Sequence, residues 1–99
     1  MHEIFKLTEN FYDNIDSLFE SWEMRISVAL MANKATMRDR AIDPGLLPRR
    51  YENSVTDPIE RGYVNSINGR VYLTTRGALI ANRGIMKLAV NGMWPPDTE

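Results

Sequence analysis

Few side chains in this sequence have the chemistry that catalysis requires. The only histidine is His2, near the start of the chain, and there is no cysteine. A Ser-His arrangement or a metal site built on histidines or thiolates is therefore not expected. Two pairs of acids, Asp13 with Asp16 and Asp57 with Glu60, stand at helical spacing, but such pairs usually are solvated or capping residues. We expect neither an enzyme nor a cofactor or metal site.

The arginines indicate a different chemistry, the binding of phosphate. The net charge of the chain is −1, yet residues 1–32 carry −4, residues 33–91 carry +5 and residues 92–99 carry −2. Clustered arginines neutralise the phosphates of nucleic acids. The uneven charge favours a binding face in the middle of the chain, although a solvated surface without a partner gives the same pattern.

These arginines surround the clearest local signal in the sequence, a β-hairpin at residues 63–74. Asn68-Gly69 is the preferred pair for a two-residue type I′ turn, because both central positions need positive φ. A two-residue loop pairs Ile67 with Arg70 and fixes the register of the strands. The face expected to join the core holds Val64, Ser66, Val71 and Leu73. The opposite face holds Tyr63, Asn65, Ile67, Arg70, Tyr72 and Thr74.

The N-terminal third predicts one long amphipathic helix. With Thr8 as N-cap, apolar residues recur at helical spacing and no glycine or proline occurs before Pro44, so the helix is expected over residues 9–38. Such a helix is roughly 45 Å long, more than a domain of this size is wide. A core face is the commoner role of an apolar stripe, but its large residues favour a homodimer through this helix. The residues predicted to form the dimer interface are Phe11, Ile15, Leu18, Phe19, Trp22 and Ile26.

The remaining segments are shorter. Prolines divide residues 43–62 into turns and one or two short helices, with Asp57 as the expected cap before Pro58. A final helix is expected over residues 76–90, where Gly84 marks either close packing or a break. The tail, residues 92–99, either docks through Trp94 or frays.

The order of short helices, hairpin and final helix resembles the winged-helix family. The matching residues are Arg61-Gly62-Tyr63-Val64, Gly69-Arg70-Val71-Tyr72-Leu73-Thr74 and Gly77. The resemblance covers residues 45–90 and implies that a recognition helix enters the major groove while the wing contacts the DNA backbone or the minor groove. The residues that would contact nucleic acid are Arg49, Arg50, Arg61, Arg70 and Arg76, with Tyr72 able to stack on a base.

The same stretch also fits a domain that binds protein. Pro48 and Pro58 interrupt the two expected helices, and Glu52, Asp57 and Glu60 would repel phosphate. Two functions therefore stay open: a dimeric DNA-binding transcriptional regulator of winged-helix type, and a protein-interaction module, an adaptor or inhibitor, that binds its partner through the N-terminal helix.

Taken together, the sequence predicts a single α+β domain over residues 1–99, mainly helical, with a winged-helix-like part at residues 43–91. The absence of cysteine and of a recognisable signal peptide predicts a cytoplasmic protein. The longest apolar stretch, Val28 to Ala32, is far shorter than the roughly 20 residues of a membrane span, so no membrane association is expected.

Overall fold

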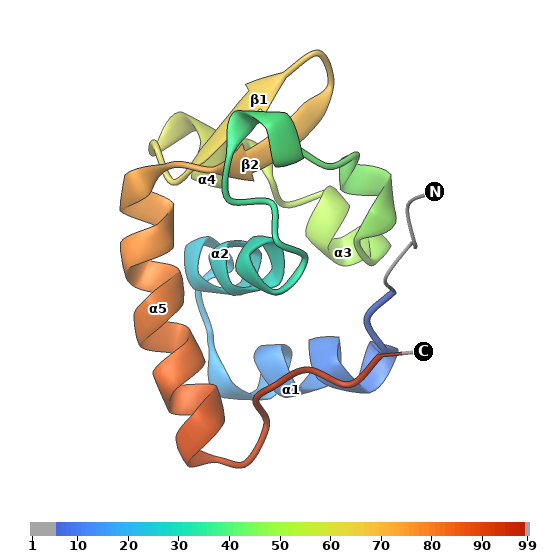
Figure 1. The fold of residues 1–99 in the computed structure, drawn as a ribbon, viewed down its shortest axis with the longest axis vertical. Coiled ribbons are helices and arrows are strands. Elements are labelled where there is room, and N and C mark those ends of the chain that lie inside the picture. The colour runs from blue at the N-terminus through green and yellow to red at the C-terminus, as the bar shows by residue number, and fades with distance from the viewer. Residues whose placement is uncertain (1–5, 99) are drawn as a thin grey trace.

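The computed structural model describes residues 6–98, so His2 lies outside the described residues. A helical body carries one two-stranded antiparallel hairpin at its end (Figure 1). The expected class, α+β and mainly helical, is confirmed. The elements in chain order are α1 (Glu9–Leu18), α2 (Trp22–Ala32), the 3₁₀ helices η1 (Arg38–Arg40) and η2 (Pro44–Leu46), α3 (Arg49–Glu52), α4 (Thr56–Glu60), β1 (Val64–Ile67), β2 (Arg70–Leu73) and α5 (Thr75–Val90).

The prediction of one helix over residues 9–38 is wrong. The chain leaves the helix at Phe19, whose backbone is extended (φ −126°, ψ 131°), and begins α2 after Ser21, whose hydroxyl accepts a hydrogen bond from the Met24 amide at 3.2 Å. Arg25 stabilises the break, because its Nε donates to the Phe19 carbonyl at 2.7 Å. A straight helix of roughly 45 Å would also exceed the longest extent of the molecule, 35 Å.

Because α1 folds back against α2, the apolar residues of the two helices pack into one core within a single chain. Four of the six predicted dimer residues belong to the core: Phe11, Ile15, Phe19 and Ile26 are at most 8% exposed. Leu18 and Trp22 are partly buried and pack against the same core. Four of the six predicted interface residues are therefore core residues of a single chain, which corrects their assignment to a dimer interface, while dimerisation itself stays a prediction.

The hairpin follows the predicted register. Ile67 pairs with Arg70 and Val64 with Leu73, and the turn residues Asn68 and Gly69 have φ of 51° and 77°. The inward face is buried except at Ser66, which is exposed although it was expected in the core.

The sequence did not predict that a third segment joins the hairpin. Ile42 exchanges two backbone hydrogen bonds with Val71, of 3.0 and 2.8 Å, and the Leu73 amide donates to the Ala35 carbonyl at 2.8 Å. These bonds hold the segment that carries η1 along the edge of β2 that does not pair with β1.

Residues 43–62, expected to hold turns and one or two short helices, form η2, α3 and α4. The prediction that Asp57 caps α4 is wrong. Asp57 lies inside the helix, where its carboxylate pairs with Arg61 Nε at 3.1 Å. Pro58 is accommodated because the helix begins two residues earlier, so its ring still lies in the first turn.

Helix α5 packs along α2 and is capped by Thr74, whose Oγ1 accepts from the Gly77 amide at 3.0 Å. Gly84 marks close packing, not a break: a Cβ there would lie 2.5 Å from Val28 Cγ2 and 2.7 Å from Met24 Sδ. The missing side chain of this glycine thus sets the distance between the two longest helices.

The tail docks on α1. The Trp94 ring lies 6.2 Å from the Phe11 ring, and the Thr8 amide donates to the Asp97 carbonyl at 3.2 Å. Figure 1 shows this tail running along α1, on the side of the body away from the hairpin.

A search of residues 6–98 for membrane spans finds no helix with the length and apolar character that crossing a membrane requires.

Candidate nucleic-acid interface

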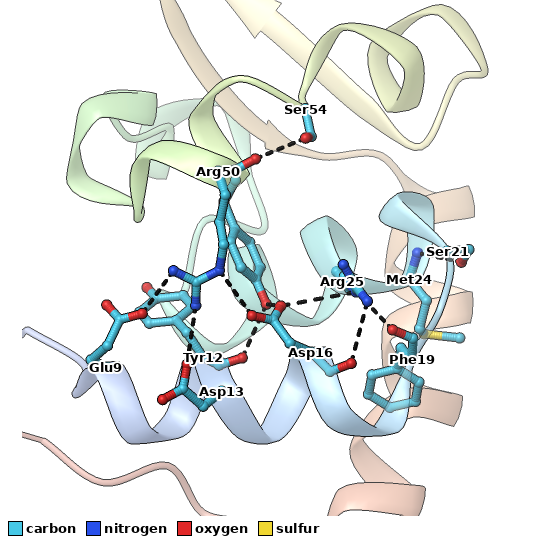
Figure 2. A network of polar contacts seen from close by, with 11 residues as sticks. Glu9, Tyr12, Asp13, Asp16, Phe19, Ser21, Met24, Arg25, Arg50 and Ser54 are labelled. Atoms are coloured by element: carbon cyan, nitrogen blue, oxygen red, sulfur yellow. Dashed lines mark hydrogen bonds and ion pairs between the residues drawn. The ribbon is translucent and has the colours of Figure 1, made fainter.

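Arg50, predicted to lie near the DNA groove, instead joins α3 to α1. Its guanidinium contacts three carboxylates of α1: Glu9 Oε1 at 2.7 Å, Asp16 Oδ2 at 2.8 Å and Asp13 Oδ1 at 3.5 Å (Figure 2). These acids stand four and three residues apart, on one side of the helix. The positive charge of Arg50 is therefore compensated by carboxylates of the same chain and is not available to bind phosphate.

Tyr51 completes this contact, which we call the α1–α3 clamp (Glu9, Asp13, Asp16, Arg50 and Tyr51). Its ring is fully buried, and its Oη donates to Asp16 Oδ1 at 2.7 Å. Burial raises the pKa of the Tyr51 hydroxyl well above its ordinary value, and the hydrogen bond to Asp16 raises it further. The clamp is thus a structural contact. Its only sequence signal was the row of acids in α1.

Arg61 and Arg76 also have partners within the chain. Arg61 Nε lies 3.1 Å from Asp57 Oδ2 and 3.4 Å from Glu23 Oε1. The Arg76 guanidinium lies 4.5 Å from the centre of the Tyr63 ring, and its Nη2 donates to the Tyr63 hydroxyl at 3.2 Å. Both arginines are held at the junction of helices and hairpin.

The environment of α4 is acidic. A pocket of about 530 Å³ lies between this helix and the start of α2, and its lining includes Glu20, Glu23, Asp57 and Glu60. Helix α4 spans only five residues. The helix that the winged-helix resemblance assigns to the major groove therefore presents negative charge where phosphates would approach.

The remaining predicted contacts are Tyr72, Arg49 and Arg70. Tyr72 is half-buried and its hydroxyl accepts from Asn65 Nδ2 at 3.2 Å, across the hairpin. Arg49 and Arg70 are exposed, and within residues 6–98 neither has an ion pair, hydrogen bond or ring contact through its side chain. The two do not share a pocket: Arg70 lines the groove described next, and Arg49 does not.

This groove, the wing groove, lies between η1 and the turn of the hairpin. Its volume is about 840 Å³. It is lined by Met37, Arg38, Asp39, Ala41, Ile67, Asn68 and Arg70. Figure 1 shows η1 beside the hairpin at one end of the molecule.

The cations around the wing groove are free. Arg38 and Arg70 line it, and Arg40 lies in the same turn of η1. All three are exposed, and in the described part of the chain none has an ion pair or hydrogen bond through its side chain. Among the described residues that line the groove, Asp39 is the only acid, so this lining carries a net charge of +1; with the adjacent Arg40 of η1 the net charge is +2.

Arg38 and Arg40 were not among the predicted contact residues, because residue 38 was expected at the end of the long helix and not beside the hairpin. The position of these two arginines beside the hairpin depends on the pairing of Ile42 with Val71, two residues far apart in the chain, and no local sequence pattern predicts that pairing.

The described residues show no group of three or more His, Cys, Asp and Glu side chains arranged to hold a metal ion. Comparison of the chain with protein-family models, with curated proteins and with solved structures found no match.

Proposed function

We propose that this protein binds duplex DNA through the wing groove, by contacts to the phosphate backbone. The observation that carries the proposal is a set of three exposed arginines at one groove: Arg38 and Arg70 line it, and Arg40 lies in the same turn of η1 as Arg38. None of the three has a carboxylate partner among the described residues. A guanidinium that already forms an ion pair must give it up to bind phosphate, whereas these three need only lose water.

The lining of the groove agrees with a backbone ligand. The groove is open, Ile67 and Ala41 contribute apolar surface to it, and Asn68 contributes a side-chain amide. Polar and cationic side chains around an open groove contact phosphate and sugar, and such contacts position a protein on DNA without reading sequence. The order α3, α4, hairpin, α5 is also the order that the winged-helix resemblance implies.

Base reading by α4 is not part of this proposal. Asp57 and Glu60 on that helix, with Glu20 and Glu23 beside it, would face a negatively charged groove. The proposed contact is therefore made by the wing and η1, with affinity that depends on salt and little on sequence.

The experiment compares two double variants that remove the same charge. A fluorescein-labelled duplex of random sequence, two helical turns long, is titrated at low salt with the unaltered protein, with Arg38→Ala/Arg70→Ala, and with Arg49→Ala/Arg83→Ala. Arg49 and Arg83 are likewise exposed and unpaired in the described chain, but they do not line the groove.

We expect the groove variant to bind roughly tenfold or more weakly, and the control variant to bind within about twofold of the unaltered protein. Equal losses in the two variants would show a general effect of charge and contradict a defined site. Absence of binding by the unaltered protein at low salt would refute the proposed function.

The other function considered for this sequence needs an apolar patch on the N-terminal helix. The residues expected to form it were Phe11, Phe19 and Trp22. Phe11 and Phe19 are 1% and 8% exposed, and Trp22 is partly buried against the core. No observation on that helix favours this route to a partner.

A further inference from the structure

The outer face of α5 carries three of the large apolar side chains that the described part of the fold leaves exposed. Leu79, Met86 and Val90 are 62%, 69% and 87% exposed. The spacing of seven and four residues places all three on one side of the helix. Ala89 is also exposed beside this row, and Asn82, the exposed residue between Leu79 and Met86, is uncharged. Exposed single apolar residues are ordinary, but an aligned row on one helix marks an interaction surface.

The buried side of α5 explains why this row points outward. Gly77, Ala81, Gly84 and Leu88 are the buried residues of the helix and face the body of the domain. In Figure 1, α5 runs along one edge of the molecule, on the side opposite α3. The apolar row therefore has no cover from any other described element, and its burial requires another molecule.

Charge limits what that molecule can be. Between Thr75 and Val90 there are three cations, Arg76, Arg83 and Lys87, and no acid. Arg76 rests on the Tyr63 ring, and Lys87 Nζ lies 3.4 Å from the Leu18 carbonyl, so both lie along one edge of the stripe. Arg83 lies between them in sequence and is exposed, with no partner among the described residues.

A second copy of this chain fits the face poorly. Two α5 helices packed antiparallel about a two-fold axis would place Arg83 beside its own symmetry mate, and neither helix carries an acid to compensate. A nucleic acid would meet the cations but leave the row of Leu79, Met86 and Val90 without an apolar partner.

We propose that the outer face of α5 docks an amphipathic helix of another protein, with an apolar seam and acidic flanking residues. The row from Leu79 to Val90 is roughly 17 Å long, which matches about three turns of a partner helix. Apolar side chains of the partner cover the row, and carboxylates along its edge pair with Arg83 and its cationic neighbours. This surface is separate from the wing groove and does not depend on DNA binding.

The test uses a synthetic probe of defined chemistry. A helical peptide of three heptads carries Leu at heptad positions a and d and Glu at positions e and g, and its flanking charges oppose self-association. The control peptide has Lys in place of every Glu. Each is titrated into the ¹⁵N-labelled full chain, and amide chemical shifts give both the site and the affinity.

We expect saturable shifts concentrated in residues 75–90 with the Glu peptide, and binding roughly tenfold weaker or more with the Lys peptide. The Arg83→Glu variant should weaken binding of the Glu peptide about tenfold and improve binding of the Lys peptide. Met86→Gln should abolish binding of both. Arg83 and Met86 are exposed, so circular dichroism should show that both variants fold as the unaltered protein does. The DNA affinity of Met86→Gln should equal that of the unaltered protein.

Three results would overturn the proposal. Equal binding of both peptides would show that charge plays no part in recognition. Chemical-shift changes outside α5, or no changes at all, would show that the peptide does not bind to the outer face of α5. A dimer in sedimentation equilibrium that Met86→Gln dissolves would assign the face to a second copy.

Discussion

Replacing Tyr51 by Phe tests whether the α1–α3 clamp is a structural contact. The hydroxyl lies 2.7 Å from Asp16 Oδ1 and 3.3 Å from the Tyr12 carbonyl oxygen, and the ring is fully buried. The substitution therefore removes the hydrogen bond to the carboxylate and the longer contact to the carbonyl, and leaves the packing nearly intact. Hydrogen bonds to charged groups contribute about 1.5–3 kcal/mol.

The lower end of that range applies here. The Asp16 side chain is 27% exposed, so water partly replaces the missing hydroxyl, and Arg50 Nε still contacts the other carboxylate oxygen at 2.8 Å. We expect a decrease of about 1.5 kcal/mol in the free energy of unfolding. For a domain of this size that decrease corresponds to a fall in Tm of roughly 6–12 °C.

Urea denaturation followed by circular dichroism measures the change, with Tyr72→Phe as the matched control. Tyr72 is only half-buried and its hydroxyl bonds to the exposed Asn65, so its removal should change the unfolding free energy by less than about 0.5 kcal/mol. A double-mutant cycle with Asp16→Ala should give a coupling above about 0.5 kcal/mol. Equal, small effects of Tyr51→Phe and Tyr72→Phe, or a coupling near zero, would refute the clamp.

Two further predictions concern stability. Gly84→Ala should destabilise the protein by about 1 kcal/mol. Overpacking against the buried Val28 costs about 1–3 kcal/mol, which exceeds the gain in helix propensity of about 1 kcal/mol. A more stable variant in chemical denaturation would contradict the close packing of α5 against α2. Burial raises the pKa of Tyr12 and Tyr51 above the ordinary value of 10.0, so the unfolded chain loses these protons first as pH rises. The two tyrosines should therefore leave the unfolding free energy unchanged below about pH 9 and lower it above about pH 10. The decrease with pH should be shallower in Tyr51→Phe. An equally steep decrease in that variant would show that Tyr51 is not its cause.

The hairpin could be predicted from sequence because its signal is local. Asn68-Gly69 fixes both the turn and the register, and no distant contact is needed. The final helix was likewise predictable, since residues 76–90 form a regular helical pattern; the structure begins it at Thr75 with Thr74 as its cap.

The break between α1 and α2 could not be predicted from periodicity. Phe11, Ile15, Ile26 and Ala29 stay in phase with one continuous helix, so the apolar stripe looks unbroken although the chain turns between its halves. Only Ser21, a good N-cap, marks the new start, and a serine alone is too common a residue to show a boundary.

The candidate site was partly predictable for a related reason. The sequence shows how many arginines the middle of the chain holds, but not which of them the fold neutralises. Arg50 is far along the chain from the three acids that bind it, and Arg38 reaches the wing through the pairing of Ile42 with Val71. Arg70 was placed correctly next to the turn of the hairpin, because the hairpin itself was predicted correctly.

The salt dependence of DNA binding tests the central claim most directly. The logarithm of the association constant is measured against the logarithm of NaCl concentration for the unaltered protein and for Arg38→Ala/Arg40→Ala/Arg70→Ala. If the three arginines bind phosphates, the slope of the variant should be shallower by about 0.9 for each arginine removed, or roughly 2.7 in total. An unchanged slope would show that the phosphates are bound elsewhere, and would contradict the assignment of the wing groove as the nucleic-acid interface.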